Sequence, residues 1–188
     1  MSAIAGLMKN DGDRLDAELL TCMASLLEYR NPDGTGIWHD DNLGLIHALL
    51  KTGDAGRENQ QPCSRSSDLW ISFDGRIDGR AKLLADLSRH GEIPCQPGLD
   101  VELVLSSYVV WGEQCVDWLI GDFAFVIWEV SRKKLFCARD RFGVRPLYYA
   151  FERRYFSFAS DLRPLLNLPW INCGLDESAL ADFLMFGY

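Results

Sequence analysis

The run Phe123-Ala124-Phe125-Val126-Ile127-Trp128-Glu129-Val130 decides the fold expected for this chain. It is built from aromatic and β-branched residues, which favour strands. Three more short apolar runs follow at residues 134–138, 147–151 and 155–159, each separated from the next by turn-forming residues. Short strands joined by close turns pair with their neighbours in antiparallel order. This region therefore predicts antiparallel meanders.

Towards the amino terminus, helical and extended patterns are interleaved. Apolar residues recur at helical spacing over residues 15–29, and helices are also predicted at 81–87, 100–111 and 176–186, with a helical turn at 162–166. Strands are predicted at 2–8, 36–39, 43–50 and 69–73, the last ended by a sharp turn at Asp74-Gly75. Residues 30–36 and 51–68 are expected to be irregular. Strands near both ends with helices between them predict a layered α+β fold.

The composition is that of a folded, acidic protein. The 188 residues are 48% apolar, and 27 acidic against 19 basic side chains give a net charge of -8. Nucleic acids and anionic membranes attract clustered Lys and Arg, so neither is expected as a partner. No apolar run reaches the roughly 18 residues of a membrane span, and residues 1–7 lack the basic segment of a signal peptide. We expect a soluble, cytoplasmic protein.

The cysteines indicate neither a metal site nor a disulfide framework. No two of them form a C-x-x-C pair, the close spacing that structural zinc sites use. A disulfide framework is not expected in so large and apolar a domain. Reduced thiols are expected at all six positions: Cys22, Cys63, Cys95, Cys115, Cys137 and Cys173.

Three features are candidates for chemistry: Ser2, the Asp74-Gly75 pair after a strand, and Asp100 at a predicted helix start. Taken singly, each has an ordinary role, as a small residue that permits removal of Met1, as a turn, and as an N-cap. The histidines give no Ser-His-Asp or Cys-His set, because they lie in unrelated contexts. No glycine-rich phosphate loop joins a strand to a helix.

The order and spacing of the whole set carry more information than its members. Several blocks resemble landmarks of the class II glutamine amidotransferase domain: Ile4-Ala5-Gly6, Pro32-Asp33-Gly34-Thr35-Gly36, Gln61-Pro62, Phe73-Asp74-Gly75, and Asp100 with Glu102. Four later blocks look like asparagine synthetase in particular: Gly121-Asp122-Phe123-Ala124-Phe125-Val126-Ile127-Trp128, Ala138-Arg139-Asp140-Arg141-Phe142-Gly143, Pro146-Leu147-Tyr148-Tyr149 and Phe158-Ala159-Ser160. The resemblance covers essentially the whole chain. It implies an N-terminal-nucleophile fold, a four-layer αββα sandwich of two antiparallel sheets.

The resemblance also implies a mechanism. In the family, removal of the initiator Met exposes a cysteine whose thiol attacks the side-chain amide of glutamine, with the free α-amine as base. An Asn side chain and a Gly backbone N–H hold the oxyanion. An Arg binds the substrate carboxylate and an Asp binds its ammonium group. The released ammonia reaches a second domain, which activates an acceptor with ATP.

This sequence departs from that pattern at the nucleophile and at the oxyanion hole. Ser2 stands at the cysteine position, followed by Ala3 where the family has Gly. A hydroxyl is a weaker nucleophile than a thiol with the same base. Asp74 stands at the Asn position, and an ionised carboxylate accepts hydrogen bonds without donating any. Gly75 keeps the backbone donor.

The substrate-binding positions also differ. Leu49 stands where the resemblance places the carboxylate-binding Arg, and leucine makes no bidentate contact. Arg76 replaces the usual Glu, while Asp100 remains at the ammonium position. We expect Asp74 to point towards Ser2 and to be held by Arg76, by the α-amine of Ser2, or by both, as an ion-paired plug. Arg76 is alternatively expected to pair with Asp78 or to extend into solvent.

These departures predict a catalytically disabled glutaminase-type domain, at residues 1–174, of an asparagine-synthetase-like, ATP-dependent amide-forming ligase. It would have a structural or docking role. β-Lactam synthetases and lasso-peptide cyclases, whose acceptor amine is internal, resemble an asparagine synthetase with a disabled glutaminase half. The chain is similar to this type of ligase. The Ser-Gly-Gly-x-Asp-Ser ATP loop is absent, so no cofactor is expected in these residues. ATP and magnesium are implied for a synthetase domain into which residues 175–188 would lead as a helix.

Two other functions remain open from the sequence. One is a slow amidohydrolase that uses Ser2 and its α-amine, acting on a substrate without a free carboxylate. The other is a free-standing module that binds a peptide or a partner protein in the altered pocket.

Overall fold

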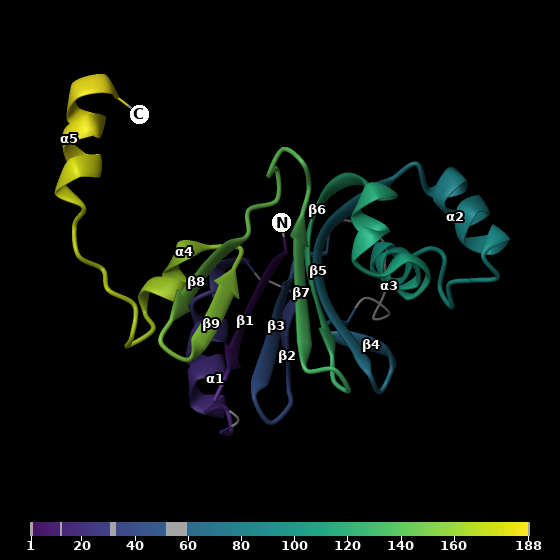
Figure 1. Cartoon of the computed structure of the whole chain (residues 1–188), viewed down its shortest axis with the longest axis horizontal. Helices are drawn as coiled ribbons and strands as arrows, with labels where there is room; N and C mark the ends of the chain where they lie inside the picture. The colour runs from purple at the N-terminus through teal and green to yellow at the C-terminus, as the bar shows by residue number, and fades with distance from the viewer. Residues whose placement is uncertain (1, 12, 31–32, 52–59, 188) are drawn as a thin grey trace.

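The computed structural model describes residues 2–11, 13–30, 33–51 and 60–187. Two antiparallel sheets lie face to face at its centre, and each outer face is covered by helices (Figure 1). The expected α+β class and the αββα layering are therefore confirmed. None of the described helices is long and apolar enough to cross a membrane.

The first sheet contains five strands in the order β2-β3-β1-β9-β8. Its helical cover is α1 (Ala17–Ser25) and α4 (Leu162–Leu166), which pack on it through Leu20, Met23 and Leu165. A 3-10 turn, η1 (Glu28–Arg30), follows α1. The strands are β1 (Ala3–Lys9), β2 (Gly34–His39), β3 (Leu43–Leu49), β8 (Tyr148–Glu152) and β9 (Tyr155–Ala159).

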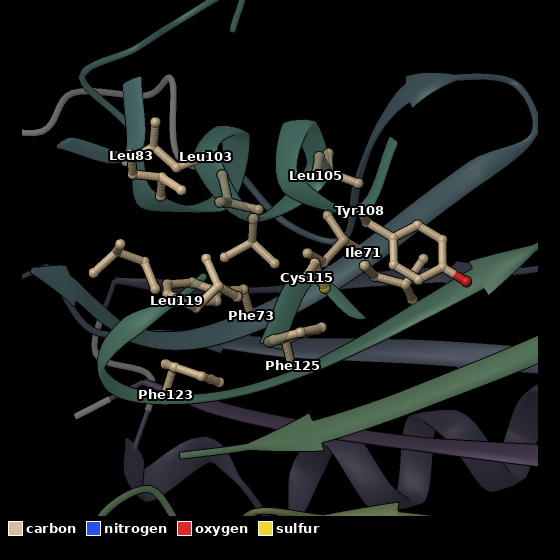
Figure 2. Close-up of a cluster of buried hydrophobic side chains, with 14 of the residues drawn as sticks. Ile71, Phe73, Leu83, Leu103, Leu105, Tyr108, Cys115, Leu119, Phe123 and Phe125 are labelled. Atoms are coloured by element: carbon tan, nitrogen blue, oxygen red, sulfur yellow. The ribbon is translucent and has the colours of Figure 1, made fainter. Parts of the chain in front are cut away.

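The second sheet contains four strands in the order β4-β5-β6-β7. They are β4 (Cys63–Ser66), β5 (Leu69–Asp78), β6 (Ile120–Glu129) and β7 (Lys134–Arg139). The helices α2 (Arg80–Arg89) and α3 (Asp100–Trp111) and the 3-10 helix η3 (Gly112–Asp117) cover its outer face. Figure 2 shows this core, with Phe73 and Phe125 from the sheet facing Leu103 and Leu105 of α3.

The space between the sheets is filled by a third apolar cluster. Ile4, Leu45, Trp128 and Phe158 belong to it, and none of them is exposed to solvent. Alternate residues of a strand point to opposite faces, so β1, β3, β5 and β6 each contribute one side to this layer and the other to a helical layer. Ser2 directly precedes β1 and Leu49 ends β3, whereas Asp74 lies within β5.

The structure corrects the turn predicted at Asp74-Gly75. The strand β5 continues through both residues, which pair with Ala124 and Phe123 of β6. Gly75 has φ +151°, and a Cβ at this position would lie 2.3 Å from the carbonyl oxygen of Asp122. Glycine at this position thus allows β5 and β6 to approach each other closely, and it adopts a backbone conformation that residues with a side chain rarely adopt.

Three other expectations need correction. The strand β4 lies inside the segment 51–68 that was expected to be irregular, and the helix predicted over 15–29 is limited to α1 with η1 after it. The N-cap of α3 is Leu99, not Asp100, which is the first residue of the helix. The remaining helices and strands agree with their predicted ranges to within a few residues.

The last helix, α5 (Glu177–Phe186), stands away from the body of the molecule (Figure 1). Its N-cap is Asp176, whose carboxylate accepts from the backbone N–H groups of Ser178 and Ala179. None of its residues is buried, and its exposed apolar side chains are Leu180, Phe183, Leu184, Met185 and Phe186.

Candidate functional site

Ser2 lies directly before β1, beside the end of β3. The register pairs Ala3 with Ala48, so the next position places Ser2 next to Leu49 and Leu50. The Ser2 Oγ accepts from the backbone N–H of Leu50 at 3.0 Å and lies 3.4 Å from the Leu50 carbonyl oxygen, to which it donates. The Ser2 hydroxyl, at the position expected for the nucleophile, is therefore hydrogen-bonded to the backbone.

Asp74 lies on β5, with 5% of its surface exposed. Its carboxylate lies 3.7 Å from the guanidinium of Arg145, a distance of an ion pair without a hydrogen bond. Burial raises the pKa of Asp74 to about 6, and the positive charges of Arg145 and Arg30 limit that rise. Near neutral pH the carboxyl is mainly ionised, so the position expected for the oxyanion donor holds an acceptor with a cation beside it.

Arg145 reaches Asp74 because its loop is held by Asp140. The buried Asp140 carboxylate accepts from the backbone N–H groups of Phe142, Val144 and Arg145, at 2.9–3.0 Å. Burial opposes its ionisation, but these hydrogen bonds prevail and keep the pKa of Asp140 below its ordinary value. In Figure 1, the loop between β7 and β8 lies at the end of the sheets where β1 begins.

The ion pair expected between Arg76 and Asp74 is wrong. The Arg76 guanidinium instead lies 3.0 Å from Asp78 and 3.9 Å from Asp122, its cross-strand partner on β6. The side chain is 63% exposed. These neighbours hold the guanidinium at the solvent-exposed end of β5, so it does not enter the space between the sheets. The expected cation beside Asp74 is present, but it comes from Arg145.

Asp100 is engaged by a residue that the sequence analysis did not single out. Arg80, the first residue of α2, forms an ion pair with the Asp100 carboxylate and also donates to the Pro97 carbonyl oxygen at 2.7 Å. No hydrogen bond or ion pair among the described residues joins Asp100 to Ser2 or Asp74. At the position of the family's ammonium-binding carboxylate, the negative charge is already paired.

A pocket of about 280 Å³ opens beside Leu49. His47 lines it and is buried, which lowers the pKa of its imidazole to about 4, so the ring is neutral at pH 7. Its other lining residues among those described include Asp33, Gln60, Gln61 and Leu49, and no Lys or Arg. An amino acid's carboxylate would find no cation in this described lining.

The walls of this pocket are fixed by Gln61, which precedes β4 and contacts a strand of each sheet. Gln61 Oε1 accepts from the backbone N–H of Phe73 at 2.7 Å. A Cβ on Gly36 would lie 1.9 Å from the Gln61 carbonyl oxygen, so β2 approaches Gln61 as closely as only glycine allows. The residues of the Pro32–Gly36 and Gln61-Pro62 blocks that the structure describes thus meet here. Among the described residues, no group of three or more His, Cys, Asp or Glu side chains is placed to hold a metal ion.

Comparisons with known proteins agree with this geometry. The sequence model of the family described as "Glutamine amidotransferase domain" matches residues 1–188. The chain is similar to asparagine synthetase [glutamine-hydrolyzing] 3 of Bacillus subtilis (strain 168), with 32% identity over 167 residues, 88% of this chain and 27% of that protein. It is also 29% identical over 206 residues to a putative asparagine synthetase 2 of Methanocaldococcus jannaschii, covering 100% of this chain and 40% of that protein.

The chain therefore spans about a quarter of the length of the first of these relatives. Among solved structures it is similar to glutamine phosphoribosylpyrophosphate amidotransferase from B. subtilis, with a TM-score of 0.70 and 18% identity. That match covers 87% of this chain and 42% of the other. At this identity the likeness shows the fold alone, which is the fold that the sequence resemblance implied.

Proposed function

The chain belongs to the glutamine amidotransferase domain family, and we propose that it is a member whose glutaminase site is disabled. The observation that carries the proposal is the buried Asp74 carboxylate paired with Arg145 at the oxyanion position. A developing oxyanion there would face a negative charge. Loss of one oxyanion donor slows catalysis by roughly 10²–10³-fold, and a reversed charge opposes the intermediate further.

The other positions support the same proposal. The Ser2 hydroxyl is bound to the backbone of Leu50, and Leu49 presents an apolar surface to the adjoining pocket. Asp100 is neutralised by Arg80. The nucleophile, the oxyanion donor and both substrate-binding charges are thus each replaced or already paired. A single substitution could adjust the rate of glutamine hydrolysis, but changes at all four positions support its loss.

We further propose that the domain comprises residues 1–174 and serves an asparagine-synthetase-like ligase as a structural or docking unit. Its relatives named asparagine synthetase are longer than this chain, which leaves room in them for a second domain. In this proposal, residues 175–188 lead into such a domain, and the apolar side chains of α5 are covered by it. ATP and magnesium would bind there. A ligase that uses an amine of its own substrate has no need of ammonia.

The test is the release of glutamate from glutamine by designed variants. Ser2→Cys alone is expected to stay inactive, because Asp74 and Leu49 still oppose the oxyanion and the substrate. The triple variant Ser2→Cys, Leu49→Arg, Asp74→Asn is the matched comparison, since it restores the family residues at all three positions. Mass spectrometry must first confirm that Met1 is removed from both. Saturable turnover by Ser2→Cys alone would falsify the proposal that the other two positions disable the site.

A further inference from the structure

A second pocket, of about 590 Å³, lies at the ends of β6 and β7, apart from the pocket beside Leu49. Leu119 and Phe123 line it and are buried members of the core in Figure 2, so part of its wall is apolar. Ile120 and Phe142 also line it and are 60% and 90% exposed. Its size falls within the range of small-molecule sites.

Two arginines, Arg139 and Arg141, also line this pocket. Ten of the thirteen arginines in the described part of the chain form an ion pair with a carboxylate, but these two form none. In a chain of net charge -8, acidic partners are plentiful, so two unpaired guanidinium groups at one pocket stand out. Planar guanidinium groups suit the oxygens of phosphate and carboxylate groups.

The end of β7, which carries Arg139, and the loop after it, which carries Arg141, are fixed in place. Asp140 lies between the two arginines and holds the loop by accepting from the backbone N–H groups of Phe142 and Val144. Gly143, with φ +65°, completes the turn, and a Cβ there would lie 3.4 Å from the Cζ of Arg139. Preorganised groups lose less freedom when a ligand binds.

We propose that this pocket binds a small molecule in which a phosphate or carboxylate group is joined to an apolar group. Arg139 and Arg141 hold the oxyanion, while Ile120, Phe142 and the buried side chains contact the apolar part. Asp117 also lines the pocket. Neither Ser2 nor Asp74 lines this pocket, so binding there can be tested independently of the proposed loss of glutaminase activity.

Calorimetric titration with four probes tests the site. Phenyl phosphate and phenylacetate distinguish the two oxyanions, inorganic phosphate lacks the apolar group, and benzylamine reverses the charge. At least one of the first two is expected to bind saturably and more tightly than inorganic phosphate, with no binding of benzylamine. Absence of saturable binding by both aromatic acids up to about 10 mM overturns the proposal. Equal binding of benzylamine, or inorganic phosphate binding as tightly as the aromatic acids, also overturns it.

Variants assign the binding to the arginines. The double variant Arg139→Gln, Arg141→Gln is expected to bind the tighter of the two aromatic acids about tenfold or more weakly than wild type does. The matched control is Arg89→Gln with Arg132→Gln, which removes two exposed arginines outside the pocket and should leave the affinity unchanged. Arg141→Gln alone serves if the double variant does not fold by circular dichroism. Unchanged affinity in a folded variant assigns the binding elsewhere and rejects this site.

Discussion

The loop of residues 140–147 and the three positions Ser2, Leu49 and Asp74 both fall within the family resemblance, but they differ in how far they match it. In the loop, Asp140 matches the family block and performs a structural task, holding three backbone N–H groups. At the three positions, the residues differ from those that the family resemblance implies for action on glutamine. Under the proposed function, residues that hold the fold together are kept, while those that the resemblance implies for catalysis are replaced.

The largest expected effect tests the structural side of this comparison. Asp140→Ala removes the acceptor of three backbone N–H groups, and each hydrogen bond to a charged group contributes about 1.5–3 kcal/mol. The free energy of unfolding in urea should therefore fall by about 3 kcal/mol or more. Asp176→Ala is the control, because Asp176 also accepts from backbone N–H groups but caps the unpacked α5. A loss of similar size in both variants would refute the special role of the loop.

The next effect concerns the altered site and depends on pH. Asp74 has a pKa of about 6 in the folded protein against an ordinary 3.8, so the folded state binds the proton more tightly than the unfolded state. Ionisation of Asp74 therefore lowers the free energy of unfolding as the pH rises from about 4 to about 6. Relative to wild type, Asp74→Asn should gain up to about 3 kcal/mol between pH 4 and pH 7. A relative loss over that range would mean that the carboxylate is favourably held.

A smaller expected effect shows which arginine forms the ion pair with Asp74. Arg145→Met removes the cation 3.7 Å from the carboxylate, so the pKa of Asp74 should rise by about one unit or more, as followed by carboxyl NMR. Arg76→Met is the matched control and should leave that pKa unchanged, because Arg76 pairs with Asp78 and Asp122. The reverse result would restore the original expectation for Arg76.

The smallest expected effect concerns whether α5 contributes to the stability of the domain. Truncation after Gly174 removes a helix with no buried residue, so the free energy of unfolding should change by less than about 0.5 kcal/mol. Urea denaturation followed by tryptophan fluorescence measures it, because Trp170, stacked on Tyr155, is retained. A loss of several kcal/mol would show that residues 175–188 belong to this domain.

Much of the fold could be predicted because it rests on local patterns. The strand β9 and the helices α3 and α4 have the predicted bounds, since apolar spacing and turn residues define them. The prediction of a turn at Asp74-Gly75 was wrong because the pairing of β5 with ten residues of β6 outweighs the preference of that dipeptide for turns. Strand pairing depends on distant residues, which local spacing does not report.

The candidate site was predictable only where residues match family blocks. Arg145 was not predicted, although it lies between two family-like blocks, one that ends at Gly143 and one that begins at Pro146. Only the geometry of the loop brings it to Asp74. Arg80 was missed because its partner Asp100 lies 20 residues away. The burial of His47, which makes its ring neutral, is a property of the assembled sheets.

The most direct test of the central claim is the release of glutamate by the unaltered protein, with Met1 removal verified by mass spectrometry. Incubated with glutamine at neutral pH, it is expected to release no glutamate above the buffer control, because Asp74 opposes the oxyanion and Leu49 provides no cation for the substrate. Saturable release of glutamate that is lost on Ser2→Ala would contradict the claim that this glutaminase site is disabled.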